Sequence, residues 1–228
     1  DFYEKYNQDG TKNKKYFVDI YYKPLDTLCG DSYSIRTLGD EVYFYLIVDG
    51  MGKGVSASLT AMLLTAYINH IINQAIQKKK LLSLRTIVNK SLKYIQPILL
   101  EDEAVSINFI RIDSHKHKFE YSSFSMPATL IQNNKNAVKK IQSNNPPLCK
   151  YIDKFKVNTL SIKTLKKVLM YSDGVTENSV KNTKELYASY IQEDFSNAAT
   201  YQDMEQIVKM RLAPQEDDIT FIFLRKVY

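Results

Sequence analysis

The pattern of apolar and polar residues changes its period along the chain, and each period predicts a different kind of element. Residues 16–22 alternate loosely and are rich in aromatic and β-branched side chains, which favours a strand. Residues 33–48 then predict a hairpin, with Gly39 supplying a positive φ in its turn. Because the ends of an antiparallel pair are adjacent, we expect Asp31 and Asp49 to be neighbours.

Two helices are predicted after the hairpin. Residues 55–77 carry apolar residues at helical spacing without Pro or Gly, and residues 84–96 show the same spacing before Pro97. The residues that we expect to face the core recur every three or four positions. They are Leu59, Met62, Leu63, Ala66, Tyr67 and Ile71 in the first helix, and Leu84, Ile87, Val88, Leu92 and Ile95 in the second.

From residue 103 the apolar period becomes two, which predicts short strands joined by polar turns. These strands cover residues 105–112, 118–122, 128–132, 137–141 and 157–162, and we interpret them as an antiparallel meander. The remaining elements are a buried strand at 167–171, helices at 183–195 and 201–212, and a final strand at 219–225. This order indicates an α+β fold in a single domain over residues 16–228, after a polar lead-in over residues 1–15.

The composition is that of an ordinary globular domain. Of 228 residues, 44% are hydrophobic and 25% are charged, so we do not expect disorder. The net charge is +6, but the basic residues are scattered and are not interleaved with stacking aromatic residues. This distribution favours solvated faces over a nucleic-acid surface, and we expect no nucleic-acid partner.

The sequence also bears on where the protein works. Cys29 and Cys149 are too few for a disulfide framework, which indicates reduced thiols and a cytoplasmic location. We find no signal peptide and no apolar run long enough to cross a bilayer, so we expect no membrane contact by this segment. Because the sequence begins at Asp1 rather than Met, we expect it to be part of a longer chain.

Acidic residues stand at the ends of several predicted strands. They are Asp31, Asp49, Asp173 and the pair Asp217-Asp218. A single Asp-Gly step after a strand is most often an ordinary turn, but the joint occurrence indicates a shared site. Carboxylates without His or Cys favour Mg²⁺ or Mn²⁺ over Zn²⁺, and several anions in one site need cations between them. Two divalent cations about 3.5–4 Å apart would meet that need.

The order of the motifs makes this site more specific. They are Gly30-Asp31, then Val48-Asp49-Gly50-Met51-Gly52-Lys53-Gly54 before a long helix, then Ser172-Asp173-Gly174-Val175-Thr176-Glu177, then Asp217-Asp218-Ile219-Thr220. The series resembles the motifs of the PPM-type metal-dependent Ser/Thr protein phosphatases, and its residues are most similar to those of their SpoIIE-like bacterial branch. The resemblance spans about residues 19–225. It implies a four-layer α-β-β-α sandwich, with two antiparallel β-sheets flanked by helices and the metal site at one end.

The resemblance also assigns roles to the motif residues. Asp49 resembles the carboxylate that bridges two metal ions, and Gly50 resembles the residue that offers its backbone carbonyl. Asp173 and Asp217 resemble ligands of the second metal, although the other acid of the final pair could face the ion instead. Asp31 resembles the acid that holds metal-bound water. The expected catalytic residues are therefore Asp31, Asp49, Asp173 and Asp217, and the expected metal ligands are these four with Gly50 and Asp218.

Some positions depart from the family pattern. Met51 replaces a His that is proposed as general acid in eukaryotic relatives, so protonation of the leaving group must come from water or be unneeded. The phosphate-gripping Arg of those relatives has no clear counterpart. Lys53 is a candidate substrate contact. The alternative is that it is an exposed lysine before a helix, without a role in binding. Cys29 replaces a Gly of many branch members, and we expect a small buried residue rather than an oxidation-sensitive one. Residues 123–127 replace the usual Ala-Gly-His segment.

The activity implied by the resemblance is hydrolysis of phosphoserine or phosphothreonine on a protein, with two divalent cations, Mn²⁺ or Mg²⁺, as cofactors. In this branch the substrate is often an anti-anti-sigma-type signalling regulator. Upstream sensor or regulatory domains often act on helices beside the metal site, here residues 55–77. The alternatives are a catalytically idle or autoinhibited binding module of the same fold, a small-molecule two-metal phosphohydrolase, and a basic nucleic-acid binder.

Overall fold

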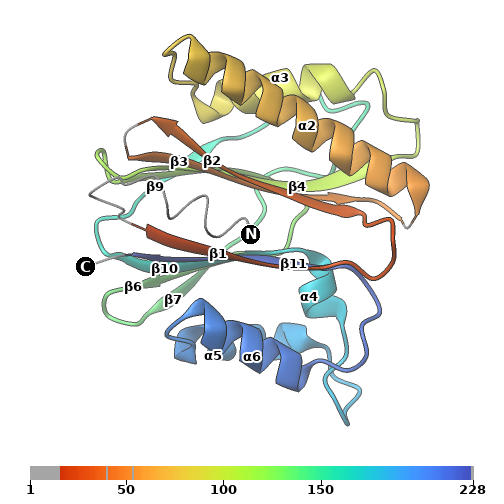
Figure 1. The fold of residues 1–228 in the computed structure, drawn as a ribbon, viewed down its shortest axis with the longest axis vertical. Coiled ribbons are helices and arrows are strands. Elements are labelled where there is room, and N and C mark those ends of the chain that lie inside the picture. Colours follow the sequence, from red (N-terminus) through yellow and green to blue (C-terminus); the bar gives the residue numbers. More distant parts are fainter. Residues whose placement is uncertain (1–15, 40, 53, 227–228) are drawn as a thin grey trace.

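The computed structural model describes residues 16–39, 41–52 and 54–226, and the predicted lead-in over residues 1–15 lies outside this part. Two antiparallel β-sheets stack face to face, and helices cover the outer surface of each sheet (Figure 1). The expected four-layer α-β-β-α sandwich is therefore confirmed.

One sheet, here called the β3 sheet, carries α2 and α3 on its outer face (Figure 1). Its strand order is β2-β3-β4-β5-β9, and the short β8 pairs with β4. The strands span Asp31–Gly39 (β2), Val42–Gly50 (β3), Ala104–Asp113 (β4), Lys118–Phe124 (β5), Leu148–Cys149 (β8) and Asn158–Ser161 (β9). β2 and β3 form the predicted hairpin, and their register places Asp31 directly opposite Asp49, which confirms the expected proximity.

The other sheet, here called the β11 sheet, carries α5 and α6 on its outer face (Figure 1). Its strand order is β1-β11-β10-β6-β7. The strands span Tyr16–Lys23 (β1), Thr129–Asn133 (β6), Val138–Ile141 (β7), Leu165–Tyr171 (β10) and Ile219–Lys226 (β11). Because β10 and β11 are antiparallel, the end of β10 lies beside the start of β11.

The helices begin and end close to where the sequence predicted, except in the segment before α5. They span Val55–Gln77 (α2), Leu84–Ile95 (α3), Asp173–Glu177 (α4), Ile191–Asn197 (α5) and Tyr201–Arg211 (α6). α2 begins after Gly54, whose φ of 89° suits glycine. Ser83 caps α3, and Thr200 forms a capping box with Asp203 at the start of α6.

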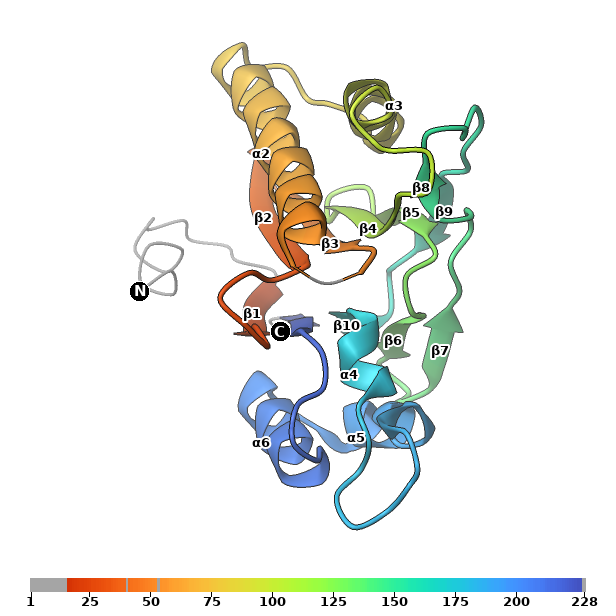
Figure 2. The same cartoon turned by 90° about the vertical axis from the view of Figure 1, so that its right-hand side faces the viewer.

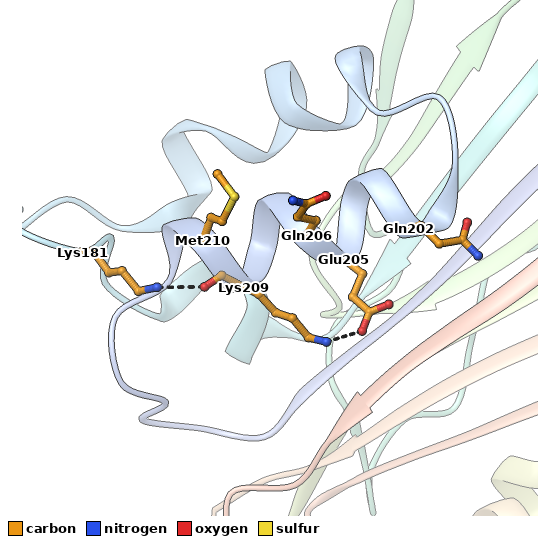
Figure 3. A pocket seen from close by; sticks show the side chains of 6 residues that line it. All are labelled: Lys181, Gln202, Glu205, Gln206, Lys209 and Met210. Carbon is orange, nitrogen blue, oxygen red and sulfur yellow. Dashed lines mark hydrogen bonds and ion pairs between the residues drawn. The ribbon is translucent and has the colours of Figure 1, made fainter.

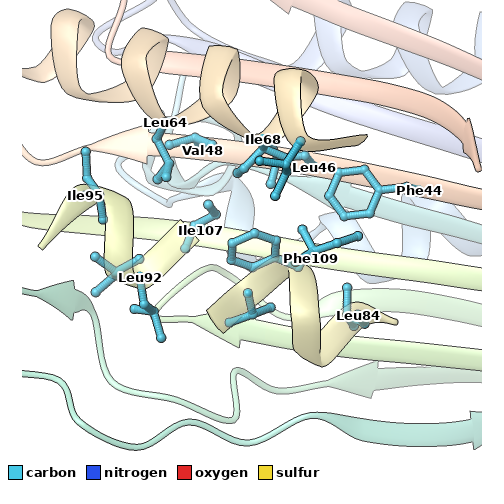
Figure 4. Packing of buried hydrophobic residues seen from close by; sticks show 14 of the residues in the cluster. Phe44, Leu46, Val48, Leu64, Ile68, Leu84, Leu92, Ile95, Ile107 and Phe109 are labelled. Atoms are coloured by element: carbon cyan, nitrogen blue, oxygen red, sulfur yellow. The ribbon is translucent and has the colours of Figure 1, made fainter. Parts of the chain in front are cut away.

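The core beneath α2 and α3 is built from alternate residues of the β3 sheet. Phe44, Leu46 and Val48 point toward the helices, where Leu64 and Ile68 of α2 meet them, and all five side chains are fully buried (Figure 4). Burial of one such side chain is worth about 1.5–3 kcal/mol. Apolar packing therefore holds α2, and with it the loop after β3, against the sheet.

The core between the two sheets uses the other face of the same strands. Tyr45 and Ile47 of β3 pack with Met170 of β10 and Ile222 of β11. Because successive side chains of a strand point to opposite faces, Asp49 continues the row that points between the sheets. β3 is thus buried on both faces until its end, where a carboxylate takes the next inward position.

The buried face of α2 differs from the predicted one. Leu59, Met62, Leu63 and Ala66 were expected in the core but are exposed, whereas Ala57, Ala61, Leu64, Ile68, Ile71 and Ile72 are buried. The prediction was wrong because this helix is apolar on more than one side, so that two stripes satisfy helical spacing. Packing against the sheet selects one of them. In α3 the five predicted core residues are all buried.

α2 is also long and apolar enough to cross a membrane, as judged by length and composition alone, because its mean hydropathy is 1.4. The expectation that no run reaches that length is therefore wrong. In this structure 44% of the apolar window is buried inside the protein, and Tyr67 of α2 stacks on Tyr94 of α3. Core helices of soluble proteins pass the same test, so the composition of α2 is weak evidence for a membrane span.

Three local predictions were wrong. The strands after residue 118 do not form one meander, because the chain crosses from β5 in the β3 sheet to β6 in the β11 sheet. The helix predicted over residues 183–195 is limited to α5 and a preceding 3-10 turn, and α4 was not foreseen. The positive φ near the hairpin turn belongs to Glu41, at 59°, and not to Gly39.

A buried lysine fastens α5 to the β11 sheet. Lys167 of β10 is 2% exposed, and its Nζ donates hydrogen bonds to the carbonyls of Phe195, Ser196 and Ala198. Carbonyls at the end of a helix lack intrahelical donors and carry partial negative charge, so an ammonium group is favourable there. The strand that leads to Asp173 is thereby supported from its outer face.

Two neighbouring leucines test whether α2 is a core helix. Leu64 is fully buried and Leu63 is 40% exposed, so the same substitution creates a cavity at one position and little change at the other. We expect Leu64→Ala to lower the free energy of unfolding by about 2–5 kcal/mol and Leu63→Ala by less than about 1 kcal/mol. Urea denaturation of both variants measures this difference, and equal losses would contradict the packing of α2.

Candidate metal centre

The acidic motifs of both sheets meet at one end of the sandwich. Figure 2 faces this end, where α4, the start of α2 and the connection from β1 to β2 lie together. Asp31 opens β2 and Asp49 is next to the last residue of β3, so the hairpin register alone brings these two carboxyl groups together. Both positions belong to the β3 sheet.

The β11 sheet contributes the other acids. Asp173 follows β10 and opens α4, and Asp217 and Asp218 precede β11. Asp173 is close enough to Asp49 for its charge to raise the pKa of that carboxyl group, and Asp217 acts on Asp49 in the same direction. The stacking of the sheets thus joins two pairs of acids that are more than 120 residues apart in the sequence.

Glycines let the surrounding segments approach each other closely. A Cβ on Gly50 would lie 2.5 Å from the carbonyl oxygen of Ala57 in α2, and a Cβ on Gly174 would lie 1.9 Å from that of Asp218. A side chain at either position would therefore force the backbones apart. The amide of Gly50 also donates to the carbonyl of Gly30 at 3.0 Å, which ties the end of β3 to the residue before Asp31.

The electrostatics of the site disfavour negative charge. Burial raises the pKa of Asp31 to about 7, hydroxyl groups of Thr220 and Ser172 act in the opposite direction, and the charges of Asp218 and Asp173 raise it further. Burial also raises the pKa of Asp49, with the nearby carboxylates of Asp173 and Asp31 adding to the effect. The carboxylates at this site therefore repel one another, and a bound cation would reduce that repulsion.

Ser172 links the two sheets beside the acids. Its fully buried Oγ donates to Oδ2 of Asp31 at 2.7 Å and accepts a hydrogen bond from the amide of Thr220 at 3.1 Å. Ser172 is the first residue of its sequence motif, but no pattern in the sequence indicated that it would contact Asp31. The contact depends on the stacking of the sheets.

The two acids of the final pair have different surroundings. Asp218 accepts a hydrogen bond on each carboxylate oxygen, from the amides of Leu25 and Gly30, both at 2.7 Å. Oδ1 of Asp217 accepts from the amide of Asp218 at 2.8 Å, and its charge acts on Asp49. The charge of Asp217 thus acts on Asp49 and that of Asp218 acts on Asp31, and the two acids differ in that both oxygens of Asp218 accept backbone amides.

The donor set fits a hard divalent cation. The gathered side chains are carboxylates, without the thiolate or imidazole groups that Zn²⁺ prefers, and the raised pKa values of Asp31 and Asp49 call for positive charge. Among the described residues, no Lys, Arg or His forms a salt bridge with these acids. The described side chains do not already surround a common point as three or more ligands, so the fit rests on their chemistry and proximity.

The predicted site residues are thus brought together with one exception. Asp31, Asp49, Gly50, Asp173, Asp217 and Asp218 all lie at this end of the sandwich, whereas Lys53 lies outside the described residues. Met51 is 58% exposed beside the site. Cys29 is half-buried, and burial raises the pKa of its thiol to about 12, which keeps it protonated.

A separate hollow on the protein surface lies over α6, away from the acids (Figure 3). Its lining is formed by Lys181, Gln202, Glu205, Gln206, Lys209 and Met210. Lys181 donates to the carbonyl of Lys209, and Lys209 pairs with Glu205, so these charged groups already have partners. The hollow contains none of the residues that the sequence singled out.

The close approach at Gly174 predicts a clear difference between two glycine substitutions. Gly174→Ala places a methyl group against the backbone of Asp218, whereas the nearest atom to a Cβ on Gly39 is 3.9 Å away. We expect Gly174→Ala to lower the free energy of unfolding by about 1–3 kcal/mol, although Ala favours helix, and Gly39→Ala to change it by less than about 0.5 kcal/mol. Thermal unfolding followed by circular dichroism compares them, and a stabilised Gly174→Ala would contradict the packing.

Asp31 predicts a pH dependence of the metal-free protein. Its pKa is about 7 in the folded protein and 3.8 ordinarily, so the unfolded chain releases this proton at lower pH. The stability of the folded state therefore falls as pH rises from about 4 to about 7. Asp31→Asn has no such proton to lose. We expect its stability advantage over the wild type in EDTA to grow across this window, and a constant difference in urea titrations would contradict the prediction.

Comparison with known proteins identifies the family. The family model described as Stage II sporulation protein E (SpoIIE) matches residues 39–227. The phosphoserine phosphatase RsbP of Bacillus subtilis (strain 168) is 25% identical over 171 residues, which cover 72% of this chain and 41% of RsbP. The chain thus spans less than half the length of this curated relative.

Two solved structures share the fold. The PP2C phosphatase domain of SpoIIE from Bacillus subtilis, solved with a fragment of its regulatory domain, aligns with a TM-score of 0.72 and 21% identity over 94% of this chain and 64% of that one. RsbX in complex with magnesium aligns with a TM-score of 0.72 and 16% identity over 95% and 98% of the two chains. At these identities the likeness shows the fold alone. Because the family model covers most of the sequence, this chain belongs to the SpoIIE family.

Proposed function

We propose that this protein hydrolyses phosphoserine or phosphothreonine esters on another protein, with divalent cations bound among Asp31, Asp49, Asp173 and Asp217. The observation that carries the proposal is the joining of carboxylates from both sheets at one end of the sandwich, where burial and the neighbouring charges raise the pKa of Asp31 and Asp49. Such an arrangement costs stability unless cations are bound, so it is better explained by a metal site than by structural need.

The residues of the chain then have distinct tasks. Asp49 lies opposite Asp31 and close to Asp173, so it is the central ligand between the two sheets. Asp217 adds a ligand just before β11, and the backbone carbonyl of Gly50, which packs against α2, is the remaining ligand that we propose. Bound divalent cations would neutralise the phosphoryl oxygens and lower the pKa of a water molecule.

Exposed apolar side chains beside the acids support a phosphate carried by a protein, because they offer another protein a surface to contact. Beside the acids stand the exposed side chains of Met51 and Val55 on the loop and first turn of α2. Because Met51 cannot donate a proton, solvent would protonate the leaving group.

The finer assignments are part of the same proposal. The name of RsbP, a phosphoserine phosphatase, supports serine esters as substrates. An anti-anti-sigma-type signalling regulator is the substrate class we propose, in the cytoplasm and under control of an upstream sensor or regulatory domain. Magnesium in the RsbX structure supports a divalent cation as cofactor, with Mn²⁺ and Mg²⁺ both to be tested.

Hydrolysis of an aryl phosphate tests the proposal directly. We expect turnover with Mn²⁺ or Mg²⁺ and none with EDTA, because the acids alone cannot stabilise the negative phosphoryl group. Asp49→Asn and Asp173→Asn should each lower turnover by more than about 100-fold, since each loses a ligand. The matched control is Asp153→Asn, at an exposed acid outside the site, which should leave turnover unchanged.

A silent wild-type chain requires a second measurement. Calorimetric titration with Mn²⁺ then distinguishes an autoinhibited enzyme, which binds the ion through Asp49 and Asp173, from an idle module, which does not. Turnover that survives both substitutions would contradict the assigned site, and absence of divalent-ion binding by the wild type would contradict the proposed function.

A further inference from the structure

The connection between β1 and β2 is held by an acid that lies far away in the sequence. The Oδ1 of Asp218 accepts a hydrogen bond from the amide of Leu25, and its Oδ2 accepts one from the amide of Gly30, both at 2.7 Å. These amides lie near the two ends of the connection. A single carboxylate at the start of β11 therefore spans the segment that leads into Asp31.

Burial contributes little to holding this connection. The side chains of Leu25 and Leu28 are 42% and 45% exposed, so they do not anchor it in the core. A second polar contact comes from the same stretch of chain, because Nε2 of Gln215 donates to the carbonyl of Lys23 and to that of Asp217, both at 2.8 Å. The segment before β11 thus fixes the connection through hydrogen bonds to its backbone.

The hydrogen bonds of Asp218 are of a strong kind. A carboxylate that accepts backbone amides makes charge-assisted bonds, about twice as strong as those between neutral groups. If Asp218 turned toward a metal ion, both amides would lose these bonds. For Asp217 the conflict is smaller, because the backbone amide it binds, that of Asp218, engages Oδ1 alone.

We propose that Asp218 is a positioning residue that clamps the β1–β2 connection and so fixes Asp31 relative to the acids that flank β10 and β11, and that it is not a metal ligand. The clamp acts across the sheets, because Asp218 directly precedes β11 of the β11 sheet and Asp31 opens β2 of the β3 sheet. The consequence for metal binding rests on the proposed function. The clamp itself is a property of the metal-free protein and is tested there.

The first test is amide hydrogen exchange of the metal-free wild type, resolved by residue with NMR. The amides of Leu25 and Gly30 should exchange at least about 10-fold more slowly than the amide of Leu28 in the middle of the connection. In Asp218→Asn one of the two carboxylate oxygens is replaced by an NH₂ group, which faces a backbone N–H donor. We expect the amides of Leu25 and Gly30 to lose their slow exchange, and the dissociation constant for Mn²⁺, measured by calorimetry, to rise about 10–100-fold.

Two matched variants separate a clamp from a ligand. Asp26→Asn makes the same change in the same connection, where the carboxylate accepts from the amide of Thr27, and should leave Mn²⁺ affinity and the exchange of Leu25 and Gly30 unchanged. Asp217→Asn should abolish Mn²⁺ binding and leave that exchange unchanged.

The proposal is overturned if Leu25 and Gly30 exchange as fast as Leu28 in the wild type, which needs no variant to fold. It is also overturned if Asp218→Asn abolishes Mn²⁺ binding while their protection persists, since that is the behaviour of a ligand. A wild type that binds no Mn²⁺ and turns over no phosphate would remove the proposed function, while the exchange measurement would still decide the clamp.

Discussion

Repulsion among closely placed, partly buried carboxylates is the constraint on which the rest of this structure depends. Asp31 and Asp49 lie on one sheet, Asp173 and Asp217 flank strands of the other, and burial together with the neighbouring charges disfavours ionisation of Asp31 and Asp49. No fold brings such groups together to gain stability, because isolated charges in a protein interior cost several kcal/mol each. The scaffold must therefore supply the free energy that keeps the sheets stacked at this end.

That free energy comes from apolar packing away from the acids. β3 buries both of its faces, one against α2 and α3 and the other against the β11 sheet. The strand therefore cannot slide without moving its entire apolar set to the wrong face, because the side-chain period is two. The same rule that buries Tyr45 and Ile47 aims Asp49 between the sheets, so the register of the core fixes the direction of the ligand.

Polar contacts then set the positions that packing leaves undefined. Ser172 reaches Asp31 across the sheets, Asp218 holds the connection that precedes it, and Gly50 and Gly174 allow backbones to approach where any side chain would intrude. Each of these contacts joins residues from different sheets or different layers. The site is for this reason sensitive to how the layers sit on one another, and α2, whose first turn touches Gly50, is a layer that can transmit such a change.

The sequence by itself determined the kinds of element, most of their bounds, the pairing of Asp31 with Asp49 and the identity of the acidic motifs. These features are local or follow from period and hairpin geometry, which neighbouring residues specify. Tertiary structure alone decided which apolar stripe of α2 is buried, since two stripes fit helical spacing and only the sheet distinguishes Leu64 from Leu63. It also decided that β5 and β6 belong to different sheets and that Asp218, rather than Asp217, accepts hydrogen bonds from the amides of Leu25 and Gly30. Those outcomes depend on contacts between residues far apart in the chain, and the local sequence does not specify such contacts.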